Sequence, residues 1–305
     1  MLTRSTRRLL TAVASLLTLL LLTPTAAWAA NEPSTALPRY LVNPGTHTFD
    51  FSYGRQLGEQ LTATWSNQRR AAPWLITVHG GSWINGSRVN GRRSVAAFAP
   101  QGWQVFNLEY PRGLEVAVEQ QVASLARAHA WIVRHAAYFH LDPQRGSAYG
   151  FSAGAHLVAE LSQVVPLRAV VSLSGVLQPQ RPAQDAVATD PSFTYTTQMA
   201  NLYTREKYMM GCAYETGATA CAQRWQSFCP EFGLRSDGTA WYIVQGTEDV
   251  IVNYRTATLF GDAVRNVGNP VEVSVLPGYG HTDDEVYDSP ARTADMIAFV
   301  AAHSA

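Results

Sequence analysis

Short apolar segments alternate with helix-like segments along most of this chain, from Phe49 onward. The apolar segments are rich in β-branched and aromatic residues, which is typical of strands buried on both faces of a parallel sheet. Because alternation of such strands with helices is the pattern of βαβ construction, the sequence predicts an α/β domain with a mostly parallel central sheet flanked by helices. The expected strands are residues 61–65, 74–78, 104–108, 146–149, 169–173, 241–244 and 271–276.

The clearest helical pattern runs from residue 118 to residue 139. Apolar residues and one histidine recur there at alternating intervals of four and three, which places them along one side of a helix. These positions are Val118, Val122, Leu125, His129, Ile132, Ala136 and Phe139. Further helices are expected to begin near Ala153, Asn253 and Ser289.

The stretch from residue 176 to residue 239 interrupts this alternation. It holds many aromatic and methionine side chains without a clear period of two or 3.6. An insertion of this length between two strands is commonly a lid or a binding loop over a functional site. We therefore predict a cap-like insertion at about 176–239, whose apolar side chains could line a substrate pocket. A peripheral patch held by a disulfide bond is the alternative interpretation.

Cys212, Cys221 and Cys229 are the three cysteines of the chain, and all of them fall in this insertion. In an exported protein one local disulfide bond is expected, with one thiol left over, and Cys212 with Cys221 is the preferred pair. A zinc site would call for Cys-x-x-Cys spacing or a nearby histidine, and the stretch has neither. No metal and no cofactor is therefore predicted.

The first 30 residues have the organisation of a secretory signal peptide. Three arginines within the first eight residues precede an apolar run at 9–22, and small residues in an Ala-x-Ala arrangement follow at 27–30. This order predicts a signal peptide at 1–30 and a mature domain at 31–305. A membrane anchor is the alternative, although the apolar run is short for a bilayer span. We expect a secreted or periplasmic protein without stable membrane insertion.

The predicted mature domain is slightly acidic. The whole chain holds 23 basic and 23 acidic residues, and the predicted signal peptide contains three of the basic residues and none of the acidic ones, which leaves 20 against 23. Such a balance gives no strongly positive surface for nucleic acid, so no nucleic-acid partner is expected. The oligomeric state is left open.

A serine bracketed by glycines, in Gly150-Phe151-Ser152-Ala153-Gly154, stands where a predicted strand gives way to a predicted helix. A serine hydroxyl is a weak nucleophile unless a base takes its proton. The Gly-x-Ser-x-Gly pattern between a strand and a helix forms a sharp turn that exposes the serine oxygen at the carboxyl end of the strand. Ser152 is therefore the predicted nucleophile.

The acid and the base expected to act with such a serine follow it in the order serine, acid, histidine. Asp249 comes soon after the predicted strand 241–244, and His281 lies in a glycine-containing loop after the last predicted strand. In this arrangement His281 is the general base and then the general acid, while Asp249 orients the imidazole and stabilises its positive charge. Glu248 is the alternative acid.

Other histidines and acids fit this order less well. His156 precedes the acid in the chain and is expected to pack on its own helix. His129 lies on the apolar side of a predicted helix, where a hydrogen-bonded core histidine is expected. Asp283 and Asp284 lie too close to His281 in the sequence to suit the usual order.

The segment His79-Gly80-Gly81-Ser82-Trp83, at the end of the predicted strand 74–78, is a candidate oxyanion hole. Preorganised backbone N–H groups stabilise the oxyanion of an attacked carbonyl by roughly 3 to 4 kcal/mol per donor. Glycines allow the main chain to approach that oxygen closely, and the N–H group after the nucleophile would complete the hole. His79 is expected to hold this loop.

These four elements in this order resemble the α/β-hydrolase fold, from about Phe49 to the C-terminus. The segment 79–83 together with residues 150–157 is most similar to the esterases related to hormone-sensitive lipase, and within them to the HGGxW-type enzymes. That group includes secreted acetyl xylan and feruloyl esterases and also kynurenine formamidases. Residues 246–252 and 278–281 match the acid and histidine segments of the same group.

The resemblance also implies the residues of the site. The implied catalytic triad is Ser152, Asp249 and His281. The implied oxyanion-hole donors are the backbone N–H groups of Gly81, Ser82 and Ala153. Trp83, the tryptophan of the motif, is assigned to substrate binding. Ser82 stands where the lipase-type motif has its third glycine, and the backbone N–H group survives this change.

The predicted function is that of a secreted serine carboxylesterase that acts through an acyl-enzyme on Ser152. The expected substrates are short-chain acyl esters or acetyl and feruloyl esters of polysaccharides. Lipase-like or acyltransferase activity on the same triad is the alternative. A non-catalytic binding module on the same fold is a further possibility, because such scaffolds do lose their chemistry.

Overall fold

The structure is a computed structural model, and it describes residues 45–304 except 69, 188–192, 215–218, 282, 284–285 and 287–288. The signal peptide predicted at 1–30 lies outside the described residues. The domain predicted at 31–305 is described from residue 45.

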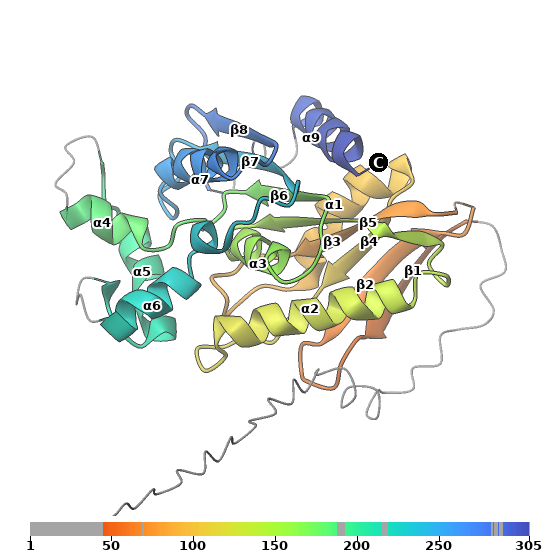
Figure 1. Ribbon diagram of the computed structural model, residues 1–305, viewed down its shortest axis with the longest axis horizontal. Helices are drawn as coiled ribbons and strands as arrows, with labels where there is room; N and C mark the ends of the chain where they lie inside the picture. The colour runs from red at the N-terminus through yellow and green to blue at the C-terminus, as the bar shows by residue number, and fades with distance from the viewer. Residues whose placement is uncertain are drawn as a thin grey trace, which may run out of the picture. The chain divides into compact units, whose positions relative to one another are not determined.

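The alternating apolar segments form one eight-stranded sheet in the order β1-β2-β4-β3-β5-β6-β7-β8 (Figure 1). The pairs β1 with β2 and β2 with β4 are antiparallel, and all other neighbours are parallel. This confirms the predicted α/β fold with a mostly parallel sheet. The strands are β1 Thr46–Ser52, β2 Gln60–Ser66, β3 Ala72–Val78, β4 Gln104–Leu108, β5 Leu141–Phe151, β6 Ala169–Leu173, β7 Ala240–Gly246 and β8 Val271–Leu276.

The strands in the middle of the sheet are apolar because both of their faces are covered. Every residue of β4, β6 and β7 is buried. Along β3 the side chains point alternately to the two faces, so that Leu75 belongs to one core and Ile76 to the other. β1 was not predicted, because four of its seven residues are exposed and its sequence lacks an apolar run.

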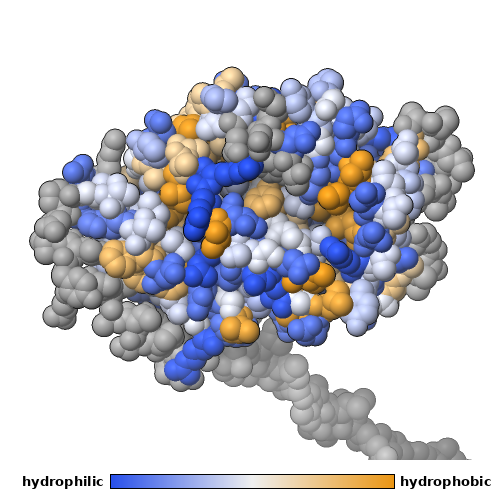
Figure 2. All heavy atoms as spheres, turned by 180° about the vertical axis from the view of Figure 1, so that it is seen from behind, coloured by the Kyte–Doolittle hydropathy of each residue, from blue (hydrophilic) through white to orange (hydrophobic). Residues whose placement is uncertain are grey.

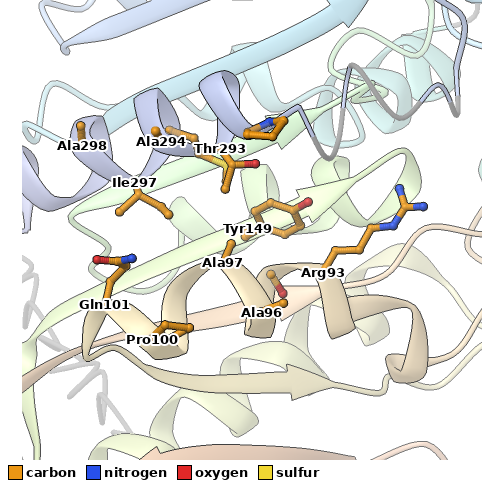
Figure 3. Close-up of a pocket in the computed structure, with 13 residues that line it drawn as sticks. Arg93, Ala96, Ala97, Pro100, Gln101, Tyr149, Thr293, Ala294, Ile297 and Ala298 are labelled. Carbon is orange, nitrogen blue, oxygen red and sulfur yellow. The ribbon is translucent and has the colours of Figure 1, made fainter.

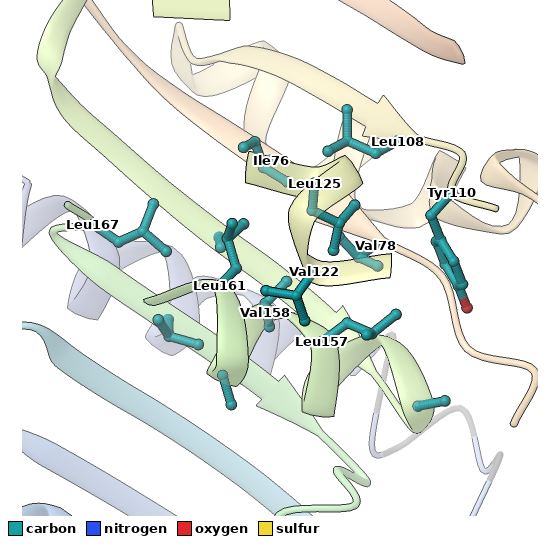
Figure 4. Packing of buried hydrophobic residues seen from close by; sticks show 14 of the residues in the cluster. Ile76, Val78, Leu108, Tyr110, Val122, Leu125, Leu157, Val158, Leu161 and Leu167 are labelled. Carbon is teal, nitrogen blue, oxygen red and sulfur yellow. The ribbon is translucent and has the colours of Figure 1, made fainter. Parts of the chain in front are cut away.

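Helices cover both faces of the sheet. α2, α3 and α7 pack on one face, and α1 and α9 pack on the other (Figure 1). Side chains of α2 and α3, such as Leu125 and Val158, gather over β3 at Ile76 (Figure 4). The helices are α1 Arg92–Phe98, α2 Val118–Arg134, α3 Ala153–Ser162, α7 Arg255–Asn266 and α9 Pro290–His303, with short 3-10 turns η1 Arg88–Gly91 and η2 Ala99–Gln101.

The predicted helix positions are confirmed with one difference. α3, α7 and α9 begin within two residues of the expected starts. α2 ends at Arg134, whereas the apolar pattern continues to Phe139. The chain turns after α2 through hydrogen bonds from the N–H groups of Tyr138 and Phe139 to the carbonyl of His135. Phe139 is still fully buried in the core, which explains why the pattern extends past the helix.

The region between β6 and β7 is largely helical. It contains α4 Arg181–Val187, α5 Thr197–Met210, α6 Thr219–Ser227 and the 3-10 turn η4 Pro230–Gly233. A disulfide bond joins Cys212, just after α5, to Cys221 in α6, as predicted, and Cys229 is a free, buried thiol.

Candidate active site

Ser152 occupies the turn between β5 and α3. Its backbone angles, φ 54° and ψ −127°, are uncommon for a residue with a side chain and cost about 1–3 kcal/mol. The N–H group of Ser152 donates to the carbonyl of Leu173 at the end of β6 over 2.9 Å, which fixes the turn to the sheet. A Cβ atom on Gly154 would collide with the main-chain carbonyls of Val78 and His79. The tight approach of the turn to β3 therefore requires glycine there.

His281 lies between Ser152 and Asp249. Its Nδ1 atom is 2.7 Å from Oδ2 of Asp249, and its Nε2 atom is 3.0 Å from Oγ of Ser152. Because a carboxylate can only accept hydrogen bonds, the Nδ1–H group donates a hydrogen bond to Asp249, and Nε2 is left to accept one from the hydroxyl group of Ser152. The three side chains are thus connected in the order that a nucleophile, its base and an orienting acid require.

Asp249 is held in a fully bonded position. The backbone N–H groups of Ile251 and Val252 both donate to its Oδ1 atom over 2.8 Å, and the side-chain amide of Gln245 donates to Oδ2 over 2.6 Å. The carboxylate is 3% exposed, whereas the neighbouring Glu248 is exposed. The histidine therefore meets Asp249, and the alternative acid Glu248 is not part of the arrangement.

The predicted oxyanion-hole residues surround the nucleophile. Gly81 and Ser82 line a cavity of about 520 Å³ together with Ser152 and His281. Gly81 has φ 122° and Ser82 has φ 51°, so this loop follows an unusual path that places its backbone beside the nucleophile. Within the described residues, the N–H groups of Gly81 and Ser82 have no protein acceptor, and that of Ala153 is a free donor at the start of α3.

His79 anchors the oxyanion-hole loop, residues 79–83, as expected. The ring of His79 contacts Oε1 of Glu109 through Nε2 at 2.8 Å, and it stacks on Tyr110 with ring centres 4.5 Å apart. Burial by itself would raise the pKa of Glu109, but the hydrogen bond and charge of His79, with Arg88 and Arg112, outweigh it, and the pKa lies below its usual value. A charged carboxylate therefore fixes the start of the candidate oxyanion hole.

Trp83 does not reach the cavity, and this corrects its assignment to substrate binding. Its side chain is fully buried, its Nε1–H group donates to Nδ1 of His156 over 3.2 Å, and its ring packs against Phe228. His156 in turn contacts the carbonyl oxygen of Phe228 through Nε2 at 2.8 Å. Burial lowers the pKa of His156 to about 4, so the ring is neutral, accepts at Nδ1 and donates at Nε2.

The other histidine and acids considered for a catalytic role are not part of the hydrogen-bonded arrangement. His129 packs against Trp74 in the core, and burial lowers its pKa to about 4, in line with the expected structural role. Asp283 accepts a hydrogen bond from the N–H group of Gly280 and so supports the histidine loop. Asp284 lies outside the described residues.

The sequence did not point to several residues that line the cavity. The walls include side chains of η1, of α1 and of β5, and Ile251 from the loop after Asp249. These residues are Asn90, Arg93, Ser94, Tyr149, Phe151 and Ile251. No motif marked Asn90, Arg93, Ser94 or Tyr149, because their place depends on how α1 packs on the sheet. Phe151 and Ile251 lie in matched segments, but they were given no role there. Gln245 could have been noticed, since it is a buried polar residue on an otherwise apolar strand next to the acid.

Within the described ranges, no group of three or more histidine, cysteine, aspartate or glutamate side chains is arranged to hold a metal ion. In the same part of the chain, no helix has the length and apolar character needed to cross a bilayer.

A family model described as BD-FAE matches residues 63–264, which include Ser152 and Asp249. Esterase LipQ of Mycobacterium tuberculosis (strain ATCC 25618 / H37Rv) is 26% identical over 262 residues, which cover 79% of this chain and 60% of LipQ. The matched part thus spans less than two thirds of the length of that relative.

Solved structures of esterases share the fold. Esterase B from Lactobacillus Rhamnosis (HN001) superposes with a TM-score of 0.68 at 16% identity, over 85% of this chain and 86% of that protein. A truncated carbohydrate esterase from gut microbiota superposes with a TM-score of 0.69 at 17% identity, over 85% of this chain and 96% of that one. At these identities the similarity concerns the fold alone.

Proposed function

Because the chain belongs to the BD-FAE family and has the α/β-hydrolase fold, we propose that it is a serine carboxylesterase. One observation carries the proposal. Ser152 Oγ, both ring nitrogens of His281 and the carboxylate of Asp249 form one chain of hydrogen bonds at the wall of a cavity. This is the constellation that converts a weak serine nucleophile into a strong one.

In the first half of the reaction, Ser152 Oγ attacks the ester carbonyl carbon while its proton passes to Nε2 of His281. The carbonyl oxygen becomes an oxyanion, which the N–H groups of Gly81, Ser82 and Ala153 would stabilise by roughly 3 to 4 kcal/mol for each donor. Collapse of this intermediate expels the alcohol, whose oxygen takes the proton from Nε2. An acyl group is then bonded to Ser152.

In the second half, water takes the place of the alcohol. His281 removes a proton from the water, the resulting oxygen attacks the acyl carbon, and Ser152 leaves with the proton returned by Nε2. Asp249 stabilises the imidazolium in both halves, because its carboxylate accepts the Nδ1–H bond throughout. The proton therefore ends on Ser152, and the cycle can repeat.

We further propose that the protein is exported and that its substrates are esters of short acyl groups or acetyl and feruloyl esters of polysaccharides. Support for export comes from the organisation of residues 1–30 and from the disulfide bond between Cys212 and Cys221, which suits an oxidising compartment. Support for a carbohydrate ester comes from the resemblance of residues 79–83 and 150–157 to the group that includes secreted acetyl xylan and feruloyl esterases.

The proposal is tested with p-nitrophenyl acetate, acetylated xylan and methyl ferulate as substrates. Ser152→Ala should lose turnover on all of them while keeping its circular dichroism spectrum and melting temperature. Ser227→Ala, which replaces an exposed serine in α6, is the matched control and should keep full activity. If Ser152→Ala retained most of the activity, the assignment of the nucleophile would be wrong.

Two further measurements test the proposed export and the alternative of a binding module. N-terminal sequencing of the exported protein should place the cleavage near Ala29 or Ala30, and an intact N-terminus would contradict the signal peptide. Wild-type protein that binds these esters without turning them over would instead be a binding module on this fold.

A further inference from the structure

A second cavity, of about 750 Å³, lies between α1 and α9 on the face of the sheet opposite to α2 and α3 (Figure 3). Arg93 lies at one end of it, Pro100 and Gln101 lie at the other, and Tyr149 of β5 lies between the two helices. Seen from behind, the surface carries hydrophobic side chains in separate patches among hydrophilic ones (Figure 2).

This groove adjoins the catalytic cavity. Arg93, Ser94 and Tyr149 line both of them. Both helices follow loops of the site, since α1 comes after the oxyanion-hole segment and α9 comes after His281. An acyl chain bonded to Ser152 that passes beside Tyr149 would enter the groove.

The walls of the groove suit an aliphatic chain. Most of the lining side chains are small or aliphatic: Ala96, Ala97, Pro100, Met296, Ile297, Ala294 and Ala298. The one aromatic ring among them, that of Tyr149, is only 4% exposed, so it offers little stacking surface to a sugar.

The reaction geometry indicates which half of the ester faces this groove. The leaving oxygen must lie beside Nε2 of His281 in order to take its proton, so the alcohol departs on the side of His281 and Ile251. The acyl group then extends to the other side of the cavity, which is formed by the oxyanion loop, α1 and β5. Arg93, Ser94 and Tyr149, where the groove begins, lie on that side.

We propose that the groove between α1 and α9 binds the acyl chain of the substrate and that it accommodates an unbranched aliphatic acyl group of medium length. The groove runs along the helix from Arg93 to Gln101, a length of about 12 Å at 1.5 Å per residue. An extended acyl chain of about eight to ten carbons has this length. This inference rests on the proposed ester hydrolysis, and it adds aliphatic acyl groups of medium length to the short acyl, acetyl and feruloyl groups proposed above.

The first experiment compares kcat/KM for p-nitrophenyl decanoate and p-nitrophenyl acetate. Ala294→Trp places a large ring in the groove at an exposed position of α9, and Ala302→Trp places the same ring on α9 outside the groove. The wild-type protein should hydrolyse decanoate as well as acetate. Ala294→Trp should lower the ratio of decanoate to acetate at least tenfold, and Ala302→Trp should leave it unchanged. An unchanged ratio in Ala294→Trp would overturn the proposal, as would a wild-type protein that hydrolyses acetate and not decanoate.

A binding experiment separates this inference from the hydrolysis itself. Decanoate is titrated calorimetrically into Ser152→Ala and into the double variant Ser152→Ala/Ala294→Trp, neither of which needs to turn over an ester. If decanoate binds to Ser152→Ala, and at least tenfold more weakly to the double variant, the result supports the groove. This holds even if the wild-type protein hydrolyses no ester. Absent binding, or equal binding to both variants, refutes the groove even if acetate esters are hydrolysed.

Discussion

Glu160 on α3 should make the stability of the protein depend on pH. Its side chain is 12% exposed, and its Oε1 atom has no hydrogen-bond partner among the described residues. Burial, with a smaller contribution from the charge of Glu119, raises the pKa of Glu160 from 4.5 to about 8. At pH 7 the carboxyl group is therefore protonated in the folded protein and ionised in the unfolded chain.

The direction of the effect follows from these two pKa values. Below pH 4.5 the group is protonated in both states, and its contribution to stability is fully present. As the pH rises toward 8, the unfolded chain releases the proton and the folded protein keeps it, so the free energy of unfolding falls. The pKa difference corresponds to a loss of about 3 to 4 kcal/mol between pH 5 and pH 8.

Urea unfolding of wild-type protein and Glu160→Gln at several pH values between 5 and 8 measures this loss. The amide has nearly the same shape and does not ionise, so the variant should gain about 3 to 4 kcal/mol relative to wild type over that range. Burial also raises the pKa values of Glu206 and Cys229. Both residues are present in both proteins, so their contributions to the pH dependence cancel in the difference. Glu115→Gln removes an exposed carboxylate whose charge does not act on Glu160, and it is the control. A difference between wild type and Glu160→Gln that stays constant with pH would refute the reasoning.

Three further changes test the site and its supports. Asp249→Asn should lower kcat by about 10³- to 10⁴-fold in steady-state assays, because the amide no longer fixes the histidine tautomer; a loss below tenfold would exclude this role. Gly154→Ala should destabilise the protein by more than about 2 kcal/mol in urea unfolding, since its methyl group meets the main chain of β3, and wild-type stability would contradict the tight approach. Trp83→Phe removes the hydrogen bond to His156 and should cost about 1–2 kcal/mol of stability while KM stays the same, whereas a raised KM would restore Trp83 to substrate binding.

Much of the sheet could be predicted because its inner strands are buried on both faces, and the edge strand β8, which is only partly buried, is still rich in β-branched residues. The segments 104–108, 169–173 and 271–276 were predicted with the same bounds that the structure gives. The meeting of the serine, the acid and the histidine could be predicted as well, because parallel strands bring their carboxyl ends to one edge of the sheet. Contact between Ser152, His281 and Asp249 followed from that topology.

Sequence signals were weaker where burial and polarity disagree. In α5 the buried residues Met199, Leu202, Tyr203, Glu206 and Met210 do follow a helical spacing. The pattern was hidden because Glu206 occupies a core position and Tyr208 is exposed. Trp83 was misassigned for a related reason, since its place in a motif beside the nucleophile says nothing about the direction of its side chain.

The contacts of His156 have a consequence for how this protein can diverge. The ring joins the oxyanion-hole segment, the helix that begins after the nucleophile, and the end of α6, three segments that are distant in sequence. Its acceptor at the last of these is a main-chain carbonyl oxygen, which every amino acid supplies. Substitutions in the region between β6 and β7 can therefore accumulate without breaking this hydrogen bond, whereas a deletion that moves the backbone at residue 228 removes it. Near the end of that region, changes in length are therefore less tolerated than changes in amino-acid type.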